Sequence, residues 1–71
     1  MKLSELIKGT EAVISGVNDP DLERCLIEMG IFAGQSVSIF KIAPFGCPLL
    51  IKTGNIRMSI RRAQADLISV E

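Results

Sequence analysis

One stretch of this sequence, residues 19–30, carries both a start signal and a stop signal for a helix, and no other stretch does. Asp19 is a good N-cap, and Pro20 suits the first helical position, where no backbone amide donor is needed. Gly30 can take the left-handed backbone that follows a helix, and Ile31 is the apolar residue expected after it. Between these signals runs an apolar stripe at spacings of three and four, formed by Leu22, Cys25, Leu26 and Met29. The sequence therefore predicts one helix and excludes a helix-turn-helix.

The remaining segments favour short strands. From Gly34 onward the apolar residues recur with a period of two: Val37 and Ile39 share one side, Lys41 continues their spacing, and Phe40 lies on the mixed side. Single helical turns are expected at residues 3–6 and 62–66, and a tight turn at 53–55. The expected strands cover residues 10–17, 36–42, 48–52, 56–61 and 67–70.

Five short strands in 71 residues would leave exposed sheet edges unless the sheet curls. A chain of this length buries only about 60% of the surface of its unfolded form, which leaves room for one core. We therefore predict a single domain over residues 1–71. Its fold class is mainly β: a small SH3-like barrel of about five short antiparallel strands, with one short helix inserted after the first strand and covering one open end.

The composition argues against an enzyme. The chain has no histidine, so it lacks the commonest general acid and base, and its two cysteines cannot complete a four-ligand zinc site. Cys25 and Cys47 lie in no paired motif, which indicates free thiols in a reducing compartment. The glycines form no phosphate-binding loop. The charged start, residues 1–5, does not resemble a signal peptide, and no stretch is long enough to span a membrane. We expect a cytoplasmic protein with no catalytic residue, cofactor or resident metal.

Charge is balanced overall but divided along the chain. Residues 1–35 have a net charge of −3, and residues 36–71 have a net charge of +3. In one compact domain this division predicts an acidic side and a basic side, although an ordinary solvated surface would show the same pattern. Three of the carboxylates, on Asp19, Asp21 and Glu23, are explained by the cap and first turn of the helix rather than by a metal or acid–base site.

A basic cluster raises the alternative of nucleic-acid binding. Its members are Lys52, Arg57, Arg61 and Arg62. Small barrels that bind nucleic acid usually place aromatic side chains beside such charges. Phe32 and Phe45 lie outside this segment, and the chain has no Trp or Tyr. The sequence therefore does not favour nucleic acid as the partner.

The segment from Ala43 to Pro48 is unusual for a connection between strands. It carries an aromatic residue, a thiol and two prolines where polar residues are common. An exposed Phe45 at its tip would indicate a contact surface. The alternative is that Phe45 folds back over the barrel mouth as a lid.

Two motifs resemble those of the FeoA family. Residues 26–37 match the pattern L-x-x-[LM]-G-[IL]-x-x-G-x-x-V, through Leu26, Met29, Gly30, Ile31, Gly34 and Val37. Residues 43–48 match A-P-x-G-x-P, and Cys47 occupies a position where no fixed residue is expected. The start and the end of the chain also fit the family pattern. The resemblance therefore covers the whole chain in order, and we expect its signature residues to be structural.

The resemblance implies a cytoplasmic accessory protein of bacterial ferrous iron uptake, recruited to the membrane by its partner without inserting into it. The implied partner is FeoB, the membrane transporter with a cytosolic GTP-binding domain. The same domain type is similar to the C-terminal module of DtxR-type metal-dependent repressors. The alternative function is therefore that of a regulatory module of this kind. The oligomeric state stays open. We expect partner binding at the residue after the helix and at the proline-rich loop: Phe32, Pro44, Phe45, Gly46, Cys47 and Pro48.

Overall fold

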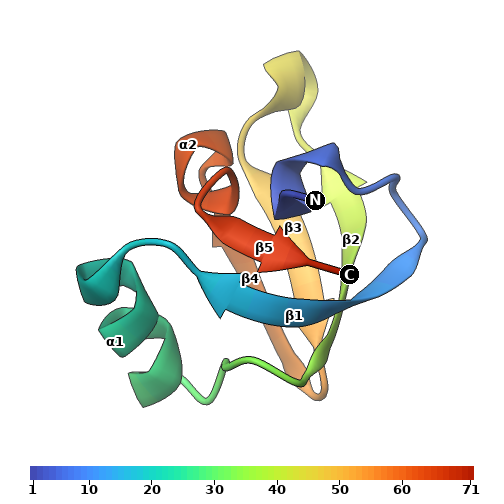
Figure 1. Cartoon of the computed structure of the whole chain (residues 1–71). Helices are drawn as coiled ribbons and strands as arrows, with labels where there is room; N and C mark the ends of the chain where they lie inside the picture. Colours follow the sequence, from blue (N-terminus) through green and yellow to red (C-terminus); the bar gives the residue numbers. More distant parts are fainter.

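A computed structural model describes all residues from 1 to 71 and contains one antiparallel sheet of five strands in the order β4-β3-β2-β1-β5 (Figure 1). The observed strands start or end within a residue or two of the expected ones. Their bounds are β1 (Glu11–Val17), β2 (Ser36–Ile42), β3 (Leu49–Thr53), β4 (Ile56–Ile60) and β5 (Ile68–Val70). The prediction of a mainly β fold with one helix after the first strand is confirmed.

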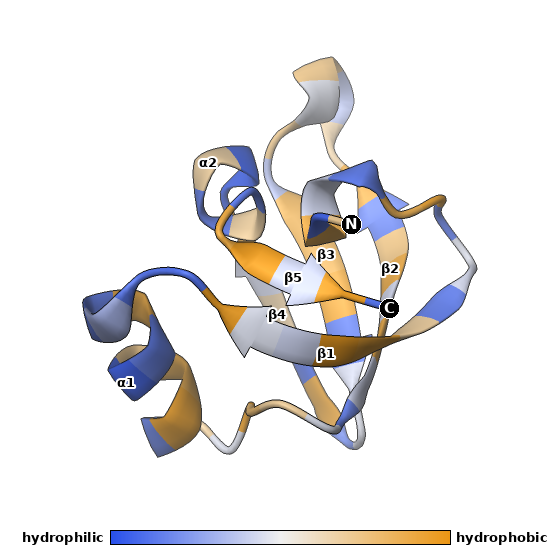
Figure 2. Ribbon diagram, in the orientation of Figure 1, coloured by the Kyte–Doolittle hydropathy of each residue, from blue (hydrophilic) through white to orange (hydrophobic).

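Period-two alternation builds the core from one face of the sheet. Val37 and Ile39 of β2 are buried, as are Leu49 and Ile51 of β3. Both edge strands contribute to the same apolar cluster, β4 through Ile60 and β5 through Ile68 and Val70. Because the two edges of the sheet share one core, the sheet must curl around it. Figure 2 shows hydrophobic residues along these strands.

The alternation in β2 stops after Ile39. A bulge places Phe40 between the pairs Ile39–Ile51 and Lys41–Leu50, so one extra residue interrupts the ladder. Phe40, Lys41 and Ile42 are all exposed in consequence. Lys41 therefore does not share the buried side of Val37 and Ile39, and the expected continuation of that spacing is wrong.

The helix α1 (Pro20–Glu28) begins and ends as the sequence indicates. Asp19 caps it by accepting from the backbone N–H of Leu22 at 3.3 Å. At its end the N–H of Gly30 donates to Ile27 O at 2.9 Å, and the N–H of Ile31 donates to Leu26 O at 2.8 Å. These two bonds form a Schellman stop, with Gly30 at φ +88° and Ile31 buried.

Only part of the expected helix stripe reaches the core. Leu26 is 2% exposed and Leu22 packs partly against the core, but Cys25 is exposed and Met29 is 46% exposed. The reason is that α1 lies beside one end of β1, so a single turn of the helix faces the sheet (Figure 1). Of the four stripe residues, Leu22 and Leu26 therefore pack on the core, whereas Cys25 and Met29 do not.

Two short helical turns and the N-terminal residue complete the fold around the sheet. The expected helical turns are the 3-10 turn η1 (Leu3–Glu5) and the helix α2 (Arg62–Ala65), and α2 joins the edge strands β4 and β5. Met1 and Val70 exchange hydrogen bonds: Met1 N donates to Val70 O at 3.0 Å, and Val70 N to Met1 O at 2.7 Å. The outer edge of β5 is thereby covered. No helix is long and apolar enough to cross a membrane.

Candidate functional site

The proline-rich segment forms a closed loop between β2 and β3. A 3-10 turn, η2 (Pro44–Gly46), occupies its tip. The Ala43 N–H donates to Pro48 O at 3.1 Å across the base, and the Gly46 N–H donates to Ala43 O at 3.0 Å within the turn. Pro44 and Pro48 restrict the backbone on either side of the tip. The loop is therefore stiff for its length.

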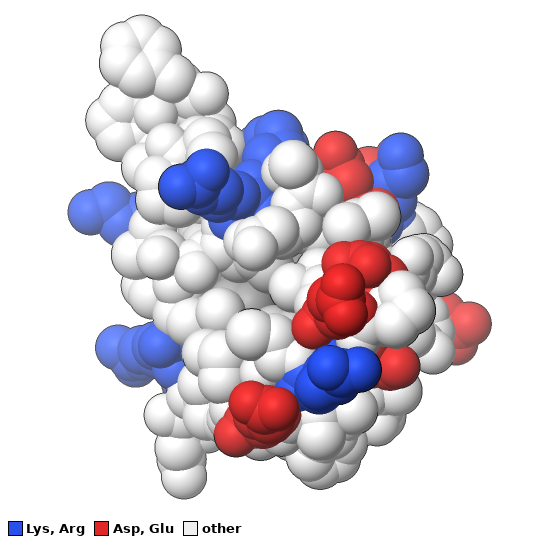
Figure 3. Space-filling view, turned by 90° about the vertical axis from the view of Figure 1, so that its left-hand side faces the viewer, with Lys and Arg blue, Asp and Glu red and all other residues white.

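Phe45 stands at the tip of this loop without packing on the barrel. Its side chain is as exposed as in an unfolded chain, at 106%, and no residue of η2 is buried. The loop projects from the body of the molecule in two views at right angles (Figures 1 and 3). The structure thus contradicts the alternative in which Phe45 is a lid. Phe45 is also the one non-glycine residue with positive φ, at +68°.

Arg62 fastens the 3-10 turn of the loop to the rest of the molecule. Its Nε–H donates to Gly46 O at 3.1 Å, and its Nη1 donates to Ser4 O at 3.3 Å. One side chain from α2 therefore joins η2 to η1. Sequence reasoning placed Arg62 in a basic cluster and missed this contact, because no local signal connects residues that lie 16 and 58 positions apart.

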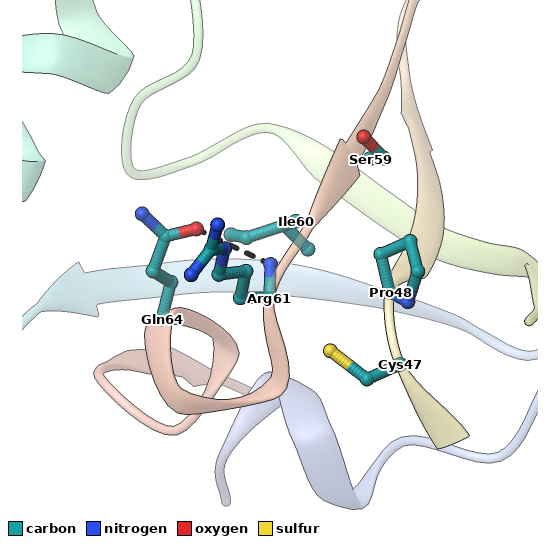
Figure 4. Close-up of a pocket in the computed structure, with 6 residues that line it drawn as sticks. All are labelled: Cys47, Pro48, Ser59, Ile60, Arg61 and Gln64. Atoms are coloured by element: carbon teal, nitrogen blue, oxygen red, sulfur yellow. Dashed lines mark hydrogen bonds between the residues drawn. The ribbon is translucent and has the colours of Figure 1, made fainter. Parts of the chain in front are cut away.

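A pocket of about 390 Å³ lies beside the loop base (Figure 4). Cys47 and Pro48 line it from the loop, and Ile60 and Arg61 line it from the end of β4. In the same pocket, Gln64 Oε1 accepts from the Arg61 N–H at 3.2 Å. Both cysteines are free and exposed, and no group of three or more His, Cys, Asp or Glu residues gathers anywhere as metal ligands would.

Phe32 lies elsewhere. It is 50% exposed and lines a groove of about 240 Å³ beside α1, together with the side chain of Glu23. The other apolar side chains of this groove, which we call the helix groove, are Val17, Ile27, Ile31 and Ala33. The segment that follows α1 and the projecting loop occupy opposite ends of the molecule (Figure 1). The structure therefore does not join Phe32 and the loop into one surface.

Gln35 orders the segment that carries Phe32. Its Oε1 accepts from the Phe32 N–H at 3.1 Å, and its Nε2 donates to Gly30 O at 2.9 Å. Sequence reasoning missed Gln35, although its position shortly after the helix stop is a usable signal. Of the signature residues, Leu26, Ile31 and Val37 are buried, whereas Gly30 and Gly34 have φ of +88° and +99°. Met29, another signature residue, is 46% exposed.

The basic cluster separates into two parts. Lys52 and Arg57 are paired across β3 and β4, whereas Arg61 and Arg62 lie near the loop base. The Arg57 guanidinium lies 5.6 Å from the centre of the Phe40 ring. An aromatic ring thus does accompany part of the cluster, which sequence reasoning missed because the ring belongs to a different strand.

Comparison with known proteins settles the family. A model of the FeoA domain matches residues 1–71. The chain belongs to the FeoA family. It is 35% identical over 72 residues to a Porphyromonas gingivalis fusion of Fe(2+) transport protein A and the Fe(2+) transporter FeoB. The matched region covers 100% of this chain but only 8% of the fusion protein. The family resemblance given by the two sequence motifs is thus confirmed.

Solved FeoA structures share the fold. The solution structure of iron(II) transport protein A from Clostridium thermocellum is 39% identical with a TM-score of 0.90, over 100% of this chain and 44% of that one. The zinc complex of Stenotrophomonas maltophilia FeoA, described as an SH3-domain protein, is 34% identical with a TM-score of 0.86, over 100% and 89% of the two chains. The predicted SH3-like fold is confirmed.

The resemblance to metal-dependent repressors extends to the fold. A manganese-dependent transcriptional repressor contains a similar domain, with a TM-score of 0.84 at 15% identity, over 99% of this chain and 40% of that one. At this identity the likeness concerns architecture alone. The same fold therefore occurs within longer chains of different kinds.

Proposed function

We propose that this chain is a cytoplasmic accessory protein of bacterial ferrous iron uptake, and that it binds the transporter FeoB through the loop from Ala43 to Pro48. The observation that carries the proposal is the fully exposed Phe45 on a stiff loop. Aromatic anchors dominate protein contacts, and this ring is available to a partner because it packs on nothing in its own chain. A loop that is already ordered loses little conformational entropy on binding.

The transporter is proposed as partner because a relative carries both proteins in one polypeptide. In the Porphyromonas gingivalis fusion, an FeoA part and an FeoB part are held at high effective concentration. In this proposal ferrous iron is the cargo of the transporter, and the chain contributes contacts rather than chemistry.

The test measures binding of the purified chain to purified full-length FeoB by calorimetry. Phe45→Ser should weaken binding by at least about 2 kcal/mol, roughly 30-fold, because it removes the anchor. Its unfolding midpoint should not fall, since the ring packs on nothing. Phe32→Ser is the matched control, because it removes a half-exposed ring at the other end of the molecule. Equal binding by wild type and Phe45→Ser would reject the loop, and a loss confined to Phe32→Ser would move the surface to the helix groove.

The pairing of Phe40 with Arg57 supports nucleic acid as a second candidate partner. The two side chains and Lys52 come from the neighbouring strands β2, β3 and β4, so charge and a stacking surface occur together. A salt-dependent gel shift with single-stranded DNA that Phe40→Ser removes would favour this function over FeoB binding.

A further inference from the structure

The helix groove is the second exposed apolar feature of the molecule, and nothing in the chain fills it. Ile27 and Phe32 are each about half exposed along it. We infer that the helix groove receives the Phe45 loop of a second copy of this chain, so that copies associate head to tail. The inference goes beyond the proposed function, and its test needs no transporter.

The groove and the ring match in size and polarity. A buried apolar cavity of roughly 150 Å³ is enough to hold benzene. The helix groove measures about 240 Å³ and offers five apolar side chains, so it can take a phenyl ring with part of the loop that carries it. Burial of two exposed apolar surfaces against each other is favourable.

Charge at the two ends favours a second copy as the occupant. Glu23 lines the groove itself, and α1 with its cap carries three further carboxylates against the single cation of Arg24. At the other end, Arg62 contacts the loop at Gly46, Arg61 lines the pocket beside it, and Lys41 precedes it on β2. No carboxylate occurs between residues 41 and 62. Figure 3 shows basic side chains mainly on the left and upper parts of the view, where the loop projects, and acidic ones mainly on the right and lower parts, with some acidic atoms also near the top. Each copy therefore presents a loop surrounded by basic side chains and an apolar groove bordered by acidic ones.

The arrangement also determines the type of assembly. The loop and the groove lie at opposite ends of the folded molecule, so a copy cannot occupy its own groove (Figure 1). A contact between two different surfaces leaves one loop and one groove free after every addition, and the association continues unless it closes into a ring. One anchor on a small patch gives a weak contact, with an expected Kd on the order of 10⁻⁴ M.

The same loop serves both proposals, so self-association would compete with FeoB binding. Ile27→Lys separates the two. It removes an apolar groove side chain that is 52% exposed and adds a positive charge that repels the basic loop base, while Phe45 stays free. This variant should lose self-association and keep FeoB binding. If the proposed function is wrong, FeoB binding is absent from wild type, and the self-association result is unaffected.

Sedimentation velocity on the purified chain from about 10 µM to about 1 mM tests the inference. Wild type should show a weight-average mass that rises beyond the dimer with concentration, and raising NaCl from 0.05 to 0.5 M should weaken the association several-fold. Phe45→Ser and Ile27→Lys should each remain monomeric at about 1 mM. An equimolar mixture of the two should form dimers and nothing larger, because it contains one intact groove and one intact loop per pair. Phe40→Ser removes an exposed ring that belongs to neither the loop nor the helix groove, and this variant should behave as wild type.

Several outcomes would overturn the inference. A wild-type chain that is monomeric at about 1 mM would do so, as would variants that associate unchanged. A mixture that stays monomeric would show that the loop and the groove do not meet, and would assign the groove to another occupant. Association that is unaffected by salt would contradict the charge complementarity from which we chose a second copy as the occupant of the groove. Equal loss in Phe40→Ser would indicate non-specific contact between exposed rings.

Discussion

Two segments of this molecule turn through left-handed backbone, and they use it for opposite purposes. After α1 the left-handed residue is Gly30, at φ +88°, and the next side chain, Ile31, is buried in the core. In the loop the left-handed residue is Phe45, at φ +68°, and its side chain is fully exposed. A glycine takes this conformation without steric cost, whereas a residue with a Cβ takes it at a cost of roughly 1–2 kcal/mol. The first segment serves folding, and the second carries strain that the core does not require.

Strain of this kind persists only where the surroundings hold it. The loop is held by the hydrogen bond from Ala43 to Pro48 and by Arg62 at Gly46. Residues in such sparsely populated conformations cluster at binding sites. The contrast gives Gly30 a role in stability and agrees with the role in recognition that we propose for Phe45, and three substitutions test it.

The largest effect is expected in the core below the helix. Leu26→Ala should lower the free energy of unfolding by about 2–5 kcal/mol, because it removes a side chain that is only 2% exposed. Cys25→Ala, on the neighbouring exposed position, should change it by less than about 0.5 kcal/mol. Urea unfolding of both variants measures the difference. Equal losses would show that the helix packs through a different face.

Gly30→Val should have the next largest effect. A side chain at φ +88° is strained, and a Cβ at this position would lie 3.3 Å from Cδ1 of Ile56. We expect a loss of about 1–3 kcal/mol, seen as a fall in the thermal midpoint of several degrees. Gly9→Val is the matched control, since Gly9 has the same φ and nothing within 4 Å of its added Cβ. It should cost less than Gly30→Val, and an unchanged midpoint for Gly30→Val would contradict the role given to the helix stop.

Phe45→Gly should have the smallest effect on stability, and the opposite sign. Glycine relieves the left-handed strain but makes the unfolded chain more flexible, so the net gain should lie between 0 and about 1 kcal/mol. Chemical denaturation monitored by circular dichroism measures it. A clear loss of stability would show that the ring packs on the barrel and would end the contrast with Gly30.

Local signals in the sequence were enough to predict the elements. The N-cap at Asp19 and the stop at Gly30 are determined by residues three or four positions away, and strand alternation is visible along each strand. The bulge at Phe40 was not predictable, because the same alternation is compatible with a regular ladder. The extent of helix burial was not predictable either, since it depends on where α1 meets β1.

The sequence was enough to predict the loop of the candidate site, but not how far the site extends over the surface. The two prolines around Phe45 indicated a stiff, unusual connection. Phe32 and this loop lie at the two ends of β2, so the strand expected over residues 36–42 already separates them, and sequence reasoning missed this signal. The contacts of Arg62 with Gly46 and of Arg57 with Phe40 were not predictable, because they join segments that no local pattern relates.

The hydrogen bonds between Met1 and Val70 place the two ends of the chain side by side. The place where the backbone starts and stops is then largely independent of the shape of the fold, because a short flexible linker could join the ends without disturbing the sheet. New ends could be opened at the turn of Gly54 and Asn55, where both residues are exposed. Such a circular permutant would keep every pair of neighbouring strands and carry its ends beside β3 and β4.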